Sequence, residues 1–246
     1  MTTIGKEFML KTRYQFLEPS AESQQVPKPP IELAFPPDTK QIILPTPSSI
    51  QTPAFDLRTA IEQRRTLRNY SPQPLTLEEL AFLLWCTQGV KKITRHPVTF
   101  RNVPSAGSLH AFETYLLCNR VEGLAPGLYR YAAIEHVLLE VDLTPGIGEK
   151  LTQACGNQSH IRTSAATFAW VAVTQRMYWR YGERGYRYLH LDAGHVCQNL
   201  YLAAEAIGCG ACAIAAFEDE EVNAALGIDG EEMFAIYLAA LGKRSS

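Results

Sequence analysis

The sequence predicts a mixed α/β protein of the α+β class, in which one domain of helices and strands follows an N-terminal arm. Residues 166–174 are nearly all apolar and fit a strand that is covered on both faces. Residues 185–207 carry apolar side chains at alternating steps of four and three, which is typical of a long packed helix. With 246 residues, of which 46% are hydrophobic, the chain can bury a substantial core.

The overall charge and composition exclude several classes of partner. A formal net charge of −2 and an isoelectric point near 6.3 give no surface-wide attraction to nucleic acid or to anionic membranes. No apolar run approaches the ~20 residues that span a bilayer, and residues 1–7 lack the basic and apolar parts of a secretory signal. We therefore expect a cytoplasmic protein without nucleic-acid or membrane partners.

Residues 1–54, the N-terminal arm, differ from the rest of the chain. They contain nine prolines and lack helical periodicity, so they indicate an extended segment and not a domain. Embedded apolar residues such as Phe35 and Leu44 suggest that the arm lies along a surface, because a disordered tail contains fewer of them. Residues 55–246 then form the predicted domain.

Two helices are predicted at the start of this domain. Asp56 can cap a short helix whose Leu57, Ala60 and Ile61 share one face, and this helix ends at Arg64 and Arg65. Residues 76–79 (Thr-Leu-Glu-Glu) form a capping box that opens a second helix. We expect this helix to end at Gly89 and to bury Leu80, Ala81, Leu83 and Leu84.

Strands and helices alternate in the remaining sequence. The patterns predict strands over 113–121, 127–131, 136–141, 166–174 and 233–241, and helices over 145–156, 185–207 and 218–227. The apolar stripe of the helix 185–207 fits a seam against a second helix and a place in the core of its own chain equally well. The sequence therefore leaves both roles open for this helix.

Two segments offer groups that bind a flat anionic ligand. Residues 64–68 (Arg-Arg-Thr-Leu-Arg) concentrate three guanidinium groups and a hydroxyl, which suit phosphate oxygens, although an isolated basic run is usually a solvated charge cluster. Residues 104–110 (Pro-Ser-Ala-Gly-Ser-Leu-His) combine small side chains with hydroxyl and amide donors, and a turn before a strand is the alternative. We expect His110 to be a structural histidine.

Two further segments are weaker candidates by themselves. Residues 208–212 (Gly-Cys-Gly-Ala-Cys) suggest redox or zinc chemistry, but no second cysteine pair is present, so a tight corner between a helix and a strand is favoured. We expect no metal site and, for the six cysteines, no disulfide framework. Residues 242–244 (Gly-Lys-Arg) close the last strand with two cations.

In this order the segments resemble the nitroreductase superfamily, and within it the SagB-type dehydrogenase branch, which includes the azoline oxidases of peptide natural-product pathways. The resemblance covers roughly residues 55–244 and rests on residues 61–70, 74–80 with 83–85, 101–110, 121–129, and 192–195 with 198–200. Five motifs in register are specific, whereas none of them is decisive alone.

The resemblance implies a central mixed, mainly antiparallel sheet flanked by helices, and a homodimer with the long helix at its interface and FMN bound between the subunits. It implies that Arg64, Arg65 and Thr66 hold the FMN phosphate and ribityl chain, with Lys243 and Arg244 closing on the phosphate, and that Arg68 reaches the pyrimidine edge of the flavin. Gly208, Cys209, Gly210 and Ala211 would lie near flavin N5. Pro104, Ser105, Ala106, Gly107 and Ser108 would approach from the other subunit.

The resemblance also implies a two-electron oxidoreductase that transfers hydride at flavin N5, with NADH or NADPH as a possible donor. It would either dehydrogenate a peptide-derived or small heterocyclic substrate or reduce nitro compounds or quinones. Azoline oxidases of the branch use a lysine–tyrosine pair, and the nearest candidate here is Arg180–Tyr181, where arginine stays protonated and a lysine could act as a base. A non-catalytic flavin-binding or flavin-sequestering protein is the alternative. Many members of the superfamily embrace the partner subunit with a C-terminal extension, whereas this chain stops at Ser246. We therefore also hypothesise that the N-terminal arm wraps the partner subunit instead.

Overall fold

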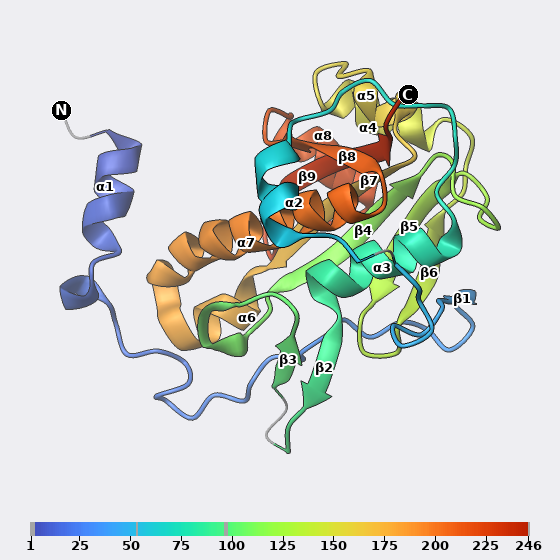
Figure 1. Cartoon of the computed structure of the whole chain (residues 1–246). Coiled ribbons are helices and arrows are strands. Elements are labelled where there is room, and N and C mark those ends of the chain that lie inside the picture. Colours follow the sequence, from blue (N-terminus) through green and yellow to red (C-terminus); the bar gives the residue numbers. More distant parts are fainter. Residues whose placement is uncertain (1–2, 53, 96–97, 246) are drawn as a thin grey trace.

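The computed structural model describes residues 3–52, 54–95 and 98–245. Its centre is a seven-stranded sheet with the order β1-β6-β5-β4-β7-β9-β8, and every pairing within it in the described part of the chain is antiparallel. Helices cover both faces of this sheet, so the predicted helix-flanked sheet is confirmed (Figure 1).

The bounds of the elements are as follows. The strands are β1 (Gln41–Ile43), β2 (Val90–Ile93), β3 (Thr99–Arg101), β4 (Phe112–Cys118), β5 (Gly127–Ala132), β6 (Val137–Asp142), β7 (Ala166–Val173), β8 (Cys209–Ile214) and β9 (Met233–Lys243). The α-helices are α1 (Ile4–Lys11), α2 (Leu57–Gln63), α3 (Leu77–Gln88), α4 (Ile147–Ala154), α5 (His160–Thr163), α6 (Thr174–Tyr181), α7 (Gly185–Ala206) and α8 (Asp219–Leu226). Three short 3₁₀ turns span Tyr14–Phe16, Ala106–Ser108 and Gly182–Arg184.

The strand β7 lies at the middle of three layers. Its Phe168 and Trp170 pack into the core beneath α3 and α7, whereas Ala169 and Val171 pack into the core beneath α4 and α8. Alternate side chains of a strand point to opposite faces, so a strand between two cores must be apolar at every position. The prediction for residues 166–174 is confirmed.

The helix α3 begins with the predicted capping box. Glu79 N donates to Thr76 Oγ1 at 3.2 Å, and Thr76 N donates to the Glu79 carboxylate at 3.0 Å. The helix ends at Gly89, but the φ of this residue is −56°, so no left-handed cap is used. Glycine is required there because an added Cβ would lie 2.2 Å from the Trp85 ring.

The helix α2 begins as predicted but buries less than predicted. Asp56 caps it by accepting a hydrogen bond from Thr59 N at 2.9 Å. Of the three apolar residues predicted to share one face, Ala60 is buried, whereas Leu57 and Ile61 are 63% and 56% exposed. Their apolar face remains available to another surface.

The helix α7 uses its apolar stripe inside its own chain. Leu189, Ala193, Val196 and Leu200 are all buried in the core that α7 shares with α3 and the sheet. Of the two roles that the sequence left open for this stripe, the structure shows packing within one chain. Among the described residues, no helix has both the length and the apolar character needed to cross a membrane.

The N-terminal arm contains regular structure that the sequence did not predict. The helix α1 lies at the edge of the molecule (Figure 1), where Met9 O accepts a hydrogen bond from Arg187 of α7, and none of its residues is buried. Further along, β1 pairs with β6 and extends the sheet, and Leu44 is buried. The helix over Ile4–Lys11 was not predicted, whereas Phe35, Ile42 and Leu44 do pack against the sheet.

Candidate functional site

The basic segment of residues 64–68 lies beside the end of β8 and β9. Leu67 N donates to Ala211 O at 2.9 Å, and Ser71 N donates to Lys243 O at 2.9 Å. Gly210 permits this close approach, because an added Cβ would lie 2.8 Å from the Leu67 side chain. The extended chain after α2 is thus joined directly to the strands.

The C-terminal cations reach the same place from the other end of the chain. Arg244 N donates to Gly208 O at 3.2 Å, and Arg244 Nε donates to Cys209 O at 3.1 Å. Lys243 forms an ion pair with Glu79, and Arg244 forms one with Glu205. Both basic segments therefore converge on residues 208–211 within a single chain.

The electrostatics of this convergence favour an anion. The Arg64 guanidinium lies 5.2 Å from the centre of the Tyr201 ring, and Thr66 Oγ1 lies 3.4 Å from the hydroxyl of the same tyrosine. Arg64, Arg65 and Arg68 form no ion pair within the described part of the chain. Of the five cationic side chains in the two basic segments, only Lys243 and Arg244 are thus paired with carboxylates, and this excess of positive charge suits a phosphate dianion.

The loop of residues 105–110 forms a second cluster on the N-terminal half of α7. Ser105 Oγ donates to the Asp192 carboxylate at 2.6 Å, and Ala106 N donates to the same group at 3.2 Å. Burial raises the pKa of Asp192. The backbone of this loop is held in an uncommon conformation, with φ values of +59° at Gly107, +54° at Ser108 and +45° at His110.

His110 fits its predicted structural role. The side chain is buried, and burial lowers its pKa to about 3, so the imidazole is neutral at neutral pH. Its backbone N donates to Ser105 Oγ at 3.0 Å, which closes the loop.

Arg180 and Tyr181 end α6 directly over this loop. Arg180 Nη1 donates to Gly107 O at 3.3 Å, and a Cβ added at Gly107 would lie 2.7 Å from the Tyr181 hydroxyl. The hydrogen bond with Glu22 of the arm raises the pKa of Arg180, so the guanidinium stays charged. Burial raises the pKa of Tyr181, which keeps its hydroxyl protonated. In this environment the pair can donate hydrogen bonds but offers no base.

The two clusters lie on opposite sides of α7. Asp192 holds the loop 105–110, and Tyr201 contacts Arg64 and Thr66. These two residues are nine positions apart on one helix, which is two and a half turns, or roughly 14 Å along the axis. The predicted site residues therefore lie in two separate clusters of the chain, which we call half-sites.

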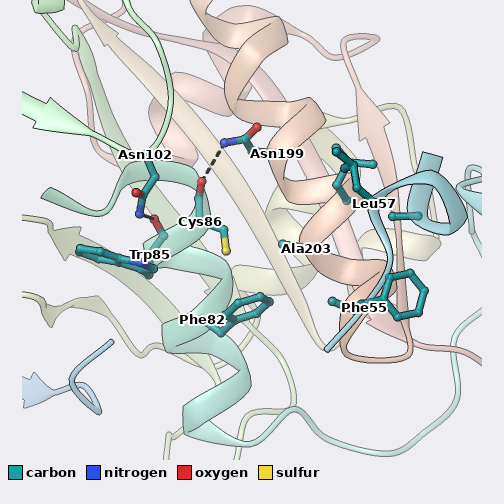
Figure 2. A pocket seen from close by; sticks show the side chains of 11 residues that line it. Phe55, Leu57, Phe82, Trp85, Cys86, Asn102, Asn199 and Ala203 are labelled. Carbon is teal, nitrogen blue, oxygen red and sulfur yellow. Dashed lines mark hydrogen bonds between the residues drawn. The ribbon is translucent and has the colours of Figure 1, made fainter. Parts of the chain in front are cut away.

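An apolar groove of about 470 Å³ runs between α2, α3 and α7. Figure 2 shows Phe55 and Leu57 on one side and Phe82 and Trp85 on the other. Asn199 of α7, which lines the groove, donates to Cys86 O of α3 at 2.9 Å (Figure 2). The motifs in the sequence did not predict this groove. Its one indication in the sequence was the apolar face of the helix that begins after Asp56.

The two cysteines of residues 208–212 do not form one centre. Cys209 packs into the core beneath α7 and Cys212 into the core on the other face of the sheet, because residues three apart on a strand face opposite ways. Burial raises the pKa of both thiols. The described residues contain no group of three or more His, Cys, Asp or Glu side chains that could hold a metal ion.

The fold is of the α+β class, and comparison with known proteins gives the family. The model of the nitroreductase family matches residues 61–243, so the chain belongs to the nitroreductase family. It is 34% identical over 191 residues to the protein named "Putative nitroreductase MJ1384" of Methanocaldococcus jannaschii, covering 78% of this chain and 91% of that protein.

Two further likenesses cover smaller shares of their proteins. A solved structure from Anabaena variabilis, also described as a putative nitroreductase, is 30% identical to this chain with a TM-score of 0.70. The match covers 85% of this chain but 42% of that one. The trifolitoxin-processing protein TfxB of Rhizobium leguminosarum is 30% identical over 110 residues, which is 43% of this chain and 30% of that protein.

Proposed function

We propose that the protein is an FMN-dependent oxidoreductase. The observation that carries the proposal is the convergence of two basic segments, 64–68 and 243–244, on the glycine-containing start of β8 at residues 208–211. FMN combines a phosphate dianion with a flat ring, and when bound it supplies two-electron transfer chemistry while the protein supplies binding and electrostatics. The residues present fit this group, because three of the arginines have no carboxylate partner in the described part of the chain.

Each segment has a role in this proposal. Arg64, Arg65 and Thr66, with Lys243 and Arg244, would bind the phosphate and the ribityl chain, and the paired glutamates Glu79 and Glu205 would hold the last two cations in place. Arg68 would supply positive charge to the pyrimidine edge of the flavin. Residues 208–211 present backbone with little side-chain bulk, which permits close approach of a flat ring.

The proposed active form is a homodimer, since the half-sites lie on opposite sides of α7. The loop 104–108 of one subunit would meet the basic segments of the other. The exposed Leu57 and Ile61 of α2 support this proposal, because exposed apolar patches mark interaction surfaces. Leu57→Glu should shift the species to monomer in light-scattering chromatography, whereas Arg58→Glu, on the same helix, should not.

Titration of the purified chain with FMN tests the cofactor. The double change Arg64→Ala and Arg68→Ala removes two unpaired cations, and two lost charge-assisted hydrogen bonds weaken affinity by roughly 100-fold or more. Arg58→Ala is the matched control, because Arg58 is exposed and pairs with Glu62 within α2. A wild-type chain that takes up no FMN, or a double variant that binds like the control, would contradict the proposal.

Stopped-flow mixing of the FMN-loaded protein with NADH and with NADPH tests the donor. Rapid bleaching of the flavin supports a reductase fed by nicotinamide. Bleaching by dithionite alone would favour a flavin-sequestering protein or another donor. The expected result is reduction by at least one of the two nicotinamides.

A second candidate is dehydrogenation of a peptide-derived heterocycle, as in the SagB-type branch. It is supported by the likeness to TfxB, whose name describes the processing of trifolitoxin. Here Arg180 and Tyr181 would face the substrate as hydrogen-bond donors. Oxygen-dependent conversion of a synthetic thiazoline peptide to the thiazole would distinguish this activity from nitro or quinone reduction. Mass spectrometry measures the conversion as the loss of two hydrogens.

A further inference from the structure

The arm meets the second half-site at one carboxylate. The backbone N of Glu22 donates to Trp179 O at 2.9 Å, and the Glu22 carboxylate accepts two hydrogen bonds from the Arg180 guanidinium, at Nε and Nη2. The Trp179 indole donates in turn to Val26 O at 2.8 Å. Residues 22–26 are therefore fastened to the last turn of α6.

The same guanidinium also holds the loop of residues 105–110. Its third nitrogen, Nη1, donates to Gly107 O. The packing at this point is tight, since a Cβ on Gly107 would lie 2.7 Å from Tyr181 Oη and 2.9 Å from Arg180 Nη1. Any movement of the Arg180 side chain must therefore be transmitted to the loop or break this contact.

The loop needs such support because its backbone is strained. Ser108 and His110 both have positive φ although neither is glycine, and such residues persist only where their surroundings fix them. Asp192 supplies the support on one side through Ser105 and Ala106. Arg180 supplies it on the other side, and Glu22 fixes Arg180.

We propose that Glu22 is a positioning residue that sets the loop 105–108 for cofactor binding through the relay Glu22–Arg180–Gly107. The effect on cofactor binding rests on the proposed function, whereas the contacts of the relay do not. Glu22 touches neither cofactor nor substrate in this scheme, and it acts by holding a bidentate donor in one orientation. The arm thereby becomes part of the site although it lies outside the matched family region, residues 61–243.

The test compares Glu22→Gln, Glu22→Asp and Glu7→Gln in the full-length chain. Glu22→Gln removes the charge and keeps the size, and Glu22→Asp keeps the charge. Glu7→Gln is the matched control, because Glu7 is also an arm carboxylate in an ion pair, with Lys11 inside α1. Amide hydrogen exchange of residues 105–110 and the dissociation constant of FMN are measured for each variant.

We expect Glu22→Gln to speed exchange at Ser108 and Leu109 severalfold. FMN affinity should weaken by roughly three- to tenfold, which corresponds to one charge-assisted hydrogen bond partly screened by solvent. Glu22→Asp should recover most of both losses, and Glu7→Gln should match wild type.

Two results would overturn the inference. Unchanged exchange at residues 105–110 in Glu22→Gln would break the relay whether or not FMN binds. Faster exchange with unchanged FMN affinity would show that the relay does not serve the cofactor. A wild-type chain that takes up no FMN is a different failure, because it removes the proposed function while the exchange measurement still reports on the relay.

Discussion

The buried carboxylate of Glu113 offers a stringent test of how the arm is held. It lies 2.6 Å from Arg176 and 3.1 Å from Arg130, and all three side chains are at most 7% exposed. It also accepts a hydrogen bond from Leu33 N at 2.9 Å. Glu113→Gln therefore deprives two buried guanidinium groups of the carboxylate that both contact, which costs about 3–5 kcal/mol.

Urea unfolding at neutral pH measures this cost, with Glu140→Gln as the control. Glu140 also joins the sheet to the arm, through Lys40 at 2.7 Å, but the lysine is 72% exposed. An exposed pair contributes at most about 1 kcal/mol. For a chain of this size the loss in Glu113→Gln corresponds to a fall of roughly 6–20 °C in Tm. A loss within about 1 kcal/mol of the control would refute the argument.

Three further predictions follow from single contacts. Gly107→Ala should lower stability by about 1–3 kcal/mol in urea unfolding and weaken FMN uptake, since φ is +59° and the new Cβ meets Tyr181. Burial raises the pKa of Glu32 from 4.5 to about 7, so the ionisation of this carboxyl lowers the free energy of unfolding as pH rises through that window. In urea unfolding, Glu32→Gln should be as stable as wild type near pH 4 and more stable than wild type at pH 8. The double change Cys209→Ala and Cys212→Ala should retain bound FMN in the absorbance spectrum, because the two thiols face opposite cores.

The parts of the fold that could be predicted from the sequence are those whose signal is local. The capping box at Thr76–Glu79 and the apolar run of β7 can each be recognised from a few neighbouring residues, and both predictions are confirmed. The helix α6 was missed because β7 runs into it at Val173 without a side-chain cap. The helix α4 begins at Ile147 after Gly146 in a left-handed conformation, so Pro145 precedes the helix and does not stand in its first turn.

The contacts at the candidate site join residues that are far apart in the sequence, so local sequence patterns could not predict them. The motifs named the basic residues, but only the strand pairing shows that Leu67 and Arg244 both bond to the start of β8 at residues 208–211. Glu22 carried no signal, because it lies in a proline-rich segment and its partner is 158 positions away. A resemblance to a family could not supply it either, since the matched region begins at residue 61.

The arm is attached at three depths, and this separates its effects on folding from its effects on the site. Residues 30–34 are held by buried Arg130 and Arg176, Glu22 by the one-third-exposed Arg180, and the buried Thr12 by the half-buried Arg184 and Arg187. Local opening requires less free energy where fewer groups are buried, so the contact at Glu22 should open more readily than the anchor at Glu113. The Glu22 contact can then open while the Glu113 anchor stays closed. For this reason Glu113→Gln should change the free energy of unfolding, whereas Glu22→Gln should change FMN affinity with little effect on unfolding.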